Sequence, residues 1–296
     1  MVKIALVIFN KSAGLMTKQD IEGLVRNKLE GLGYQVDLFY LNDNFETAIL
    51  GHNFLGTELV VAVGGDGTVK VAAKTILNNK LSAPLGIIPF GSANVIATDL
   101  GIPLTVKQAI KLLAQPEKTA KIDVGIINKN HYFLVGLSIG YISHVIASTP
   151  GDLKNKFGSF GYLWRFIFNK IKIRKIKFKI KTQNKTFWVK GNSLVIFNAI
   201  NYFGLKLKKN IDLKDGVLNL YVFTDKTLLS LIGAFFYLLW RQQPKKYIFT
   251  LDNNYFKIYL NRGWNSCQID GDYLKISKEI EVEVLPKALE VVIPQL

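Results

Sequence analysis

The first 123 residues alternate apolar strands with amphipathic helices, and this pattern restricts the N-terminal part of the chain to few folds. Strands that alternate with helices form a mostly parallel sheet with helices on both faces. We therefore predict a Rossmann-like, three-layer α/β nucleotide domain over residues 1–123, with its ligand at the carboxyl ends of the strands. The expected strands are Val2–Asn10, Tyr34–Tyr40, Leu59–Val63 and Leu85–Pro89, and the expected helices are Thr17–Leu32, Thr68–Asn78, Asn94–Leu100 and Val106–Gln115.

After Asp123 the pattern changes to short strands separated by turn signals, which is typical of an antiparallel sandwich. We expect a β-rich domain with an antiparallel β-sandwich over residues 124–286, and a C-terminal segment, 287–296, that returns to the first domain. The expected strands are Ile126–Asn128, Tyr132–Val135, Lys175–Lys181, Thr186–Val189, Ser193–Asn198, Val217–Thr224, Tyr247–Leu260 and Glu279–Leu285, and the expected helices are Phe160–Ile171 and Lys226–Arg241.

Composition excludes several classes of protein. In 296 residues there is one cysteine, Cys267, so an internal disulfide is excluded and a cysteine-based zinc site is disfavoured. Hydrophobic residues make up 49% of the chain, which excludes a disordered protein. The apolar run Leu228–Trp240 is shorter than the ~18 residues that cross a bilayer, so it predicts a buried helix or one lying on a membrane surface. We expect a reduced, cytoplasmic protein.

The positive charge is concentrated in one part of the chain. Lys and Arg total 38 against 22 Asp and Glu, a net charge of +16, and residues 153–211 contain 15 Lys or Arg and no acid. A solvated sheet face explains part of this basic segment, but a stretch of one sign favours an anionic partner. Membrane surface and nucleic acid both qualify, and the interleaved aromatic residues favour an anionic membrane surface over nucleic acid.

The motif that carries most chemistry is Val60–Thr68, which reads VVAVGGDGT. A buried strand ends in a glycine turn, and a helix begins at Thr68. Glycines let the backbone approach phosphates, and the free N–H groups of the helix start bind an anion. The carboxylate of Asp66 would repel a bare phosphate, which argues for a magnesium ion between them. The motif therefore predicts a nucleotide site.

This motif is followed by Ile87–Asn94, which reads IIPFGSAN, and the pair resembles the diacylglycerol kinase catalytic domain. That family includes bacterial diacylglycerol kinases, YegS-type lipid kinases, and sphingosine and ceramide kinases. The resemblance covers essentially the whole chain. Further matching motifs are Asn10–Gly14, Ile122–Gly125 with Gly136–Gly140, Leu213–Val217 and Ile269–Asp272.

The resemblance implies an ATP- and Mg²⁺-dependent lipid kinase of phospholipid biosynthesis, peripheral at the inner membrane face. In phosphoryl transfer, positioning and charge neutralisation dominate the catalysis. Asp270 is the candidate general base, although Asp-Gly is also a strong turn signal. Asp215, with the backbone carbonyls of Asp212 and Val217, is expected to bind magnesium, although Asp215 too can be read as a turn residue. The residues expected to bind ATP are Asn10, Ser12, Gly14, Gly64, Gly65, Asp66, Gly67, Thr68, Gly91, Ser92 and Asn94.

Two readings compete with this one. NAD kinases and phosphofructokinases share a GGDG loop but act on soluble substrates, and they lack the basic, aromatic stretch and the second Asp-Gly motif. An inactive kinase fold could instead serve as a membrane- or RNA-binding module, against which the joint presence of Asp66, Asp215 and Asp270 argues.

The acceptor lipid and the assembly, for which a homodimer is one option, stay open. Val95 stands where many diacylglycerol kinases carry Asp, which argues against strict diacylglycerol specificity. For the base, the sequence predicts that Asp270→Asn lowers kcat and leaves the melting temperature unchanged, because Asn keeps the turn propensity.

Overall fold

The computed structural model describes residues 2–10, 18–42, 44–147, 175–199, 201–202, 205–206, 212–224, 248–261 and 266–294. The chain divides into two compact units. Unit 1 contains residues 1–122 and 287–296, and unit 2 contains residues 123–286. The helices expected at Phe160–Ile171 and Lys226–Arg241 lie outside the described residues. Among the helices that the structure describes, none is long and apolar enough to cross a membrane.

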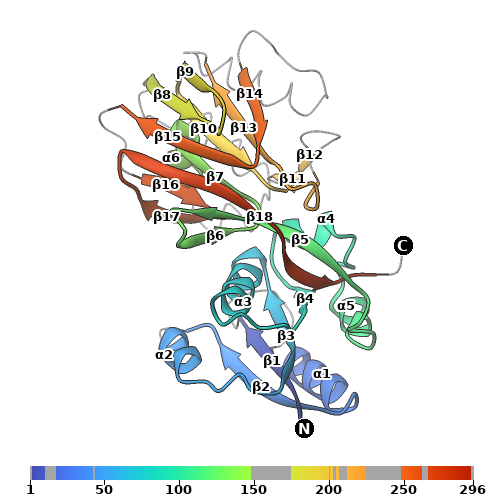
Figure 1. Ribbon diagram of the computed structural model, residues 1–296. Helices are drawn as coiled ribbons and strands as arrows, with labels where there is room; N and C mark the ends of the chain where they lie inside the picture. The colour runs from blue at the N-terminus through green and yellow to red at the C-terminus, as the bar shows by residue number, and fades with distance from the viewer. Residues whose placement is uncertain are drawn as a thin grey trace. The chain divides into compact units, whose positions relative to one another are not determined.

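Unit 1 is built on a parallel sheet whose strand order is β2-β1-β3-β4, followed by the last residues of β18 (Figure 1). The central strands are apolar along their whole length, because helices cover both faces of a parallel sheet. Val60, Val61 and Ala62 are fully buried in β3. The strands are β1 (Lys3–Phe9), β2 (Tyr34–Tyr40), β3 (Thr57–Gly64), β4 (Leu85–Pro89) and β18 (Glu279–Val292).

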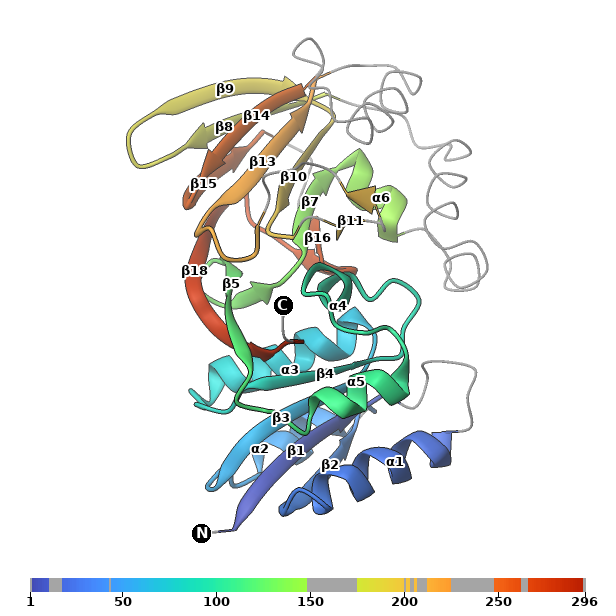
Figure 2. The same ribbon diagram turned by 90° about the vertical axis from the view of Figure 1, so that its right-hand side faces the viewer.

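Helices lie on both faces of this sheet (Figure 2). Helices α1 and α5 pack together on one face, where Ile21, Val25 and Ala109 join one core cluster with the strands. Helix α3 packs along β3 with Val69, Ala72 and Ile76 buried. The three-layer α/β architecture is thus confirmed. The helices are α1 (Lys18–Glu30), α2 (Phe45–Leu50), α3 (Asp66–Asn78), α4 (Val95–Asp99) and α5 (Val106–Leu112).

Unit 2 is an antiparallel β-sandwich, as predicted. One sheet has the order β14-β13-β10-β7-β16-β17, and the other runs β18-β15-β8-β9. Alternate residues of both sheets meet in one core, which includes Phe178, Leu194 and Phe256. The strands are β7 (Gly136–Gly140), β8 (Ile176–Lys181), β9 (Thr186–Gly191), β10 (Ser193–Phe197), β13 (Leu218–Phe223), β14 (Ile248–Asn253), β15 (Tyr255–Leu260), β16 (Ser266–Ile269) and β17 (Asp272–Lys275).

Shorter elements complete the two units. Strand β5 passes from unit 1 into unit 2 along the chain, and β18 passes back. Strand β6 pairs with β5, and β11 pairs with β12. Their bounds are β5 (Thr119–Ile127), β6 (His131–Phe133), α6 (Tyr141–Ala147), β11 (Asn201–Tyr202) and β12 (Leu205–Lys206).

Three predicted strands differ clearly from the structure. The strand expected over Ile126–Asn128 begins earlier, at Thr119, and ends at Ile127 as β5. The single strand expected over Tyr247–Leu260 is wrong: the chain bends at Asn254, and the amide oxygen of Asn253 accepts a hydrogen bond from the N–H of Tyr255 at 3.2 Å. Strands β14 and β15 on either side of the bend belong to different sheets. The last strand does not end at Leu285 but continues to Val292 as β18, because it pairs next with β4 at Val291 and Leu85.

Candidate active site

Two glycine-rich loops of unit 1 lie in direct backbone contact. They follow β3 and β4, which are neighbours in the sheet, and the N–H of Phe90 donates to the carbonyl of Gly64 at 2.8 Å. A Cβ placed on Gly91 would lie 2.5 Å from the Cα of Gly65, closer than such atoms approach. The approach therefore requires glycine at these positions, and the structure brings together the two motifs that the sequence singled out.

Helix α3 begins inside this pair of loops. Its first residue is Asp66, preceded by Gly65 in an extended conformation. The hydroxyl oxygen of Thr68 is buried and has no hydrogen-bond partner among the described residues, and a Cβ on Gly64 would lie 2.2 Å from it. A buried hydroxyl without a partner costs free energy. The free N–H groups of the helix start and this hydroxyl together form donors suited to a phosphate oxygen.

Asn94 and Asp66 hold the two loops in place. Asn94 adopts a left-handed conformation with φ 48°, and its side chain accepts from the N–H of Gly91 and donates to its carbonyl, at 3.0 and 2.8 Å. One carboxylate oxygen of Asp66 accepts from the N–H of Ile96 at 3.3 Å, near the start of α4. Asn94 is therefore a positioning residue. Asp66 caps the start of helix α4, which follows the neighbouring loop, and the sequence did not predict this role.

The other residues of unit 1 that were expected to bind ATP are Asn10, Gly67, Ser92, Ser12 and Gly14. Asn10 follows β1, donates its N–H to the carbonyl of Val63 at 3.0 Å, and has its Cβ next to Gly64. Gly67 and Ser92 are exposed beside the loops. Ser12 and Gly14 lie outside the described residues.

In unit 2, Asp270 occupies the two-residue turn between β16 and β17. Asp270 and Gly271 have φ values of 46° and 100°, the left-handed pair of a type I′ hairpin turn. The carboxylate also accepts three backbone hydrogen bonds, from the N–H groups of Leu134, Val135 and Gly136, at 2.7, 3.0 and 2.9 Å. Sequence reasoning found the turn but not this anchor, which stabilises the ionised carboxylate and fixes its position.

This anchor corrects one expectation. An Asn at position 270 has a single acceptor oxygen, and its NH₂ group would face backbone donors. At least one buried N–H would then lose its partner, which costs about 1–3 kcal/mol. With these three hydrogen bonds taken into account, we expect Asp270→Asn to lower the melting temperature rather than leave it unchanged.

The predicted metal loop, residues 212–217, is attached to strand β5 at Asp123. The N–H of Gly216 donates to the buried carboxylate of Asp123 at 2.6 Å, and the N–H of Val217 donates to Asp215 at 2.9 Å. Burial raises the pKa of the Asp215 carboxyl, and the negative charges of Asp123 and Asp212 raise it further. Among the described residues no three acidic, histidine or cysteine side chains converge as a metal cage. The metal ligands that this loop can provide are therefore the carboxylate of Asp215 and backbone carbonyl oxygens.

Asn198 connects two acidic residues of unit 2, Asp123 and Asp270, through hydrogen bonds. Its buried amide NH₂ donates to the carbonyl oxygens of Asp123 and Leu134, at 3.0 and 2.9 Å. Leu134 in turn donates its N–H to Asp270, so a chain of hydrogen bonds joins Asp270 to Asp123. Sequence reasoning missed Asn198. The available signal was an Asn directly after an apolar strand, which is weak by itself.

Comparisons with known proteins agree with this geometry. The family model described as "Diacylglycerol kinase catalytic domain" matches residues 4–127. "Probable lipid kinase YegS" from Salmonella arizonae is 28% identical over 98% of this chain and 95% of its own length. "Probable lipid kinase YegS-like" from Citrobacter koseri is 29% identical, with the same coverage.

Solved structures show the same fold. A crystal structure named as that of a diacylglycerol kinase from Bacillus anthracis has a TM-score of 0.77 and 18% identity, covering 99% of this chain and 97% of that one. Another solved structure from the same organism has a TM-score of 0.81 and 20% identity, with the same coverage. The resemblance to the diacylglycerol kinase catalytic-domain family that the motifs indicate is thus confirmed: residues 4–127 match the model of that domain, and the chain is similar over nearly its whole length to curated proteins named as probable lipid kinases.

Proposed function

We propose that this protein is an ATP- and magnesium-dependent lipid kinase that transfers the γ-phosphoryl group of ATP to a lipid hydroxyl. The pair of glycine loops in unit 1 carries the proposal. Backbone without Cβ atoms, the start of α3 and the unpartnered hydroxyl of Thr68 lie together there. This donor set fits the phosphates of a nucleotide.

In the proposed reaction the lipid hydroxyl oxygen forms a bond to the γ-phosphorus, and the bond from that phosphorus to the bridging oxygen of ADP breaks. The hydroxyl proton passes to Asp270. Three backbone donors fix the position of this carboxylate. Phosphoryl transfer passes through a loose transition state and leaves the protein little covalent chemistry to perform. The residues chiefly position the reactants and neutralise charge.

Magnesium would be held in two places by residues of this chain. In unit 1 the carboxylate of Asp66 lies at the start of α3, where it can share a cation with a phosphate. In unit 2 the Asp215 loop offers a carboxylate with a raised pKa and backbone oxygens, a hard-oxygen donor set. Bound magnesium supplies charge neutralisation to phosphoryl transfer.

The proposal is tested with a panel of acceptors. The purified protein is incubated with labelled ATP, Mg²⁺ and detergent-dispersed diacylglycerol, a sphingoid base or phosphatidylglycerol, and products are identified by mass spectrometry. NAD and fructose 6-phosphate serve as soluble acceptors. Phosphorylation of a lipid supports the proposal. Phosphorylation confined to a soluble acceptor, or no phosphorylation with ATP and Mg²⁺ present, contradicts it.

Asp66→Asn distinguishes two roles of Asp66, because it removes the negative charge and keeps an oxygen that can cap helix α4. Asn is as good a helix-capping acceptor as Asp, so its oxygen keeps the bond to Ile96 and stability should change by less than ~0.5 kcal/mol. Because the charge is lost, affinity for Mg²⁺–ATP should fall by roughly tenfold. Calorimetric titration with ATP, with and without Mg²⁺, measures this. Unchanged Mg²⁺–ATP affinity would show that Asp66 only caps α4.

Asp215→Asn is expected to remove a magnesium-dependent stabilisation. The raised pKa of Asp215 means that its ionised form destabilises unit 2 in the absence of a cation, so Asn should not lower the metal-free melting temperature. The rise in melting temperature that Mg²⁺ produces in the parent protein should disappear. Glu283→Gln, which removes the same charge from an exposed position, should retain it. Equal magnesium responses in both variants would argue against a metal at Asp215.

A further inference from the structure

The outer face of the β8–β9 hairpin in unit 2 combines uncompensated lysines with an exposed tryptophan. Alternate residues of β8 point into the core, where Ile176, Phe178 and Ile180 are buried. The intervening positions are lysines. On β9, the edge strand of the sheet (Figure 2), Trp188 is 72% exposed. We call this the Lys–Trp face; it consists of Lys177, Lys179, Lys181, Trp188 and Lys190.

The side chains of this face are arranged around aromatic rings. The ammonium group of Lys179 lies 5.0 Å from the ring centroid of Trp188 and 5.4 Å from that of Tyr259 on β15. The ammonium of Lys181 lies 5.6 Å from the same tyrosine ring. Cation–π contacts of this kind hold the charges at the surface beside the rings.

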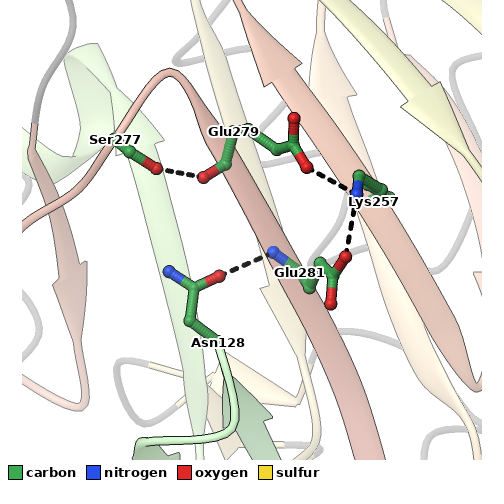
Figure 3. Close-up of polar contacts among 5 residues, drawn as sticks. All are labelled: Asn128, Lys257, Ser277, Glu279 and Glu281. Carbon is green, nitrogen blue, oxygen red and sulfur yellow. Dashed lines mark hydrogen bonds and ion pairs between the residues drawn. The ribbon is translucent and has the colours of Figure 1, made fainter.

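Two acidic residues of the same sheet, Glu279 and Glu281, form ion pairs with Lys257, which is not part of the Lys–Trp face. Figure 3 shows Lys257 of β15 between Glu279 and Glu281 of β18, at 2.5 and 2.9 Å. Both carboxylates raise the pKa of Lys257, and Lys257 lowers that of Glu281. Glu281 is also fixed by its backbone, whose N–H donates to Asn128 at 2.8 Å. Among the described residues, the four lysines of the Lys–Trp face form no ion pair.

This arrangement costs the isolated hairpin stability. Lys177 lies opposite Lys190 across the two strands of the hairpin. Like charges directly opposite each other are destabilising, and an exposed indole leaves its apolar surface in water. An anionic surface that accepts an aromatic ring relieves both costs at once.

We infer that the Lys–Trp face docks this protein on an anionic lipid bilayer, with Trp188 inserted at the headgroup level between lysines bound to lipid phosphates. Tryptophan and tyrosine favour the interface of a bilayer, and each lysine near an anionic membrane adds to the attraction. The choice of a lipid surface over another polyanion rests on the proposed function, because a lipid kinase must reach a substrate within a membrane. The sequence predicted that the basic segment 153–211 contacts an anionic membrane, and we assign this contact to one described surface within it, the Lys–Trp face.

Binding is tested with vesicles that contain no kinase acceptor under assay, so that docking and catalysis fail independently. Phosphatidylcholine vesicles with and without phosphatidylserine are sedimented with the protein at low and high salt. We expect binding only with phosphatidylserine, and weaker binding as salt rises. The variant with Lys177→Gln, Lys179→Gln and Lys181→Gln should bind at least about tenfold more weakly. Trp188→Ala should bind roughly tenfold more weakly.

A matched control removes three charges from unit 1. Lys107, Lys111 and Lys121 are exposed, and their joint change to Gln alters the net charge equally. This control should bind at least severalfold more tightly than the triple variant of the Lys–Trp face. All variants should phosphorylate detergent-dispersed lipid at the parent rate if the proposed function holds. Equal losses in the two triple variants would show a net-charge effect and overturn the docking face.

Fluorescence quenching offers a second readout that needs only the conservative variant Trp188→Phe. Vesicles carrying brominated acyl chains should quench its fluorescence, and Trp188→Phe should remove part of that quenching. Quenching that is identical in the parent and Trp188→Phe would place Trp188 away from the bilayer and contradict the inference. Tighter binding to a single-stranded RNA than to anionic vesicles, with the same lysine dependence, would overturn it as well.

Discussion

Asp270→Asn is expected to lower kcat for lipid phosphorylation by roughly 10²- to 10⁴-fold, because the general base is lost while the turn remains. ATP affinity should survive, since the loops proposed to bind the phosphates belong to unit 1 and Asp270 belongs to unit 2. The free energy of unfolding should also fall by about 1–3 kcal/mol, because the three backbone donors lose part of their anchor. Steady-state kinetics, ATP titration and thermal unfolding measure the three quantities.

The loss of stability requires a control, since a loosened turn could lower kcat by itself. Ile258→Val in the fully buried part of β15 should cost about 0.5–1.5 kcal/mol without altering any polar group. Assays are run at a temperature where circular dichroism shows both variants folded. If Ile258→Val loses as much kcat as Asp270→Asn, the carboxylate is only a structural anchor and another group accepts the proton.

Gly91→Ala should reduce kcat/KM for ATP by roughly 10²-fold, the second largest effect that we expect. The new Cβ would lie 2.5 Å from the Cα of Gly65, which is backbone and cannot rotate away. The two loops must separate, which moves the start of α3 relative to the loop after β4. Overpacking of this kind also costs about 1–3 kcal/mol of stability. Initial rates over a range of ATP concentrations, together with thermal unfolding, provide the measurement.

Gly23→Ala is the matched control for this change. Gly23 lies in helix α1, and a Cβ there meets no atom within 4 Å. The substitution should leave kcat/KM unchanged and stabilise the helix by about 0.5–1 kcal/mol. Parent-like ATP kinetics in Gly91→Ala would show that the nucleotide does not bind at the paired loops.

Local pattern was sufficient to predict most of unit 1. Strands such as β3 are continuous apolar runs that end in glycine, and in the following helix apolar residues recur with the helical period. Each element can therefore be predicted from its own residues. The parallel neighbours β3 and β4 then bring their loops together by topology alone. The contact between Gly65 and Gly91 follows from that arrangement.

Long-range polar contacts could not be predicted in the same way. Three consecutive polar residues, Asp252, Asn253 and Asn254, are a local turn signal, but they do not show that β14 and β15 join different sheets. The anchor of Asp270 connects residues more than 130 positions apart, and Asn198 reaches Asp123 over 75 positions. No local signal specifies such partners, because they depend on how the strands of unit 2 pair.

Strand β18 has a consequence for how the protein is made. In the part of the chain that the structure describes, the edge of β4 that faces away from β3 pairs with residues near Val291, which the ribosome synthesises after all of unit 2. The N-terminal unit, although synthesised first, must therefore mature last, and the nascent chain carries an open parallel edge while residues 123–286 emerge and fold. An unpaired strand edge is a template for aggregation, so this interval is where a chaperone would most influence the yield of native protein.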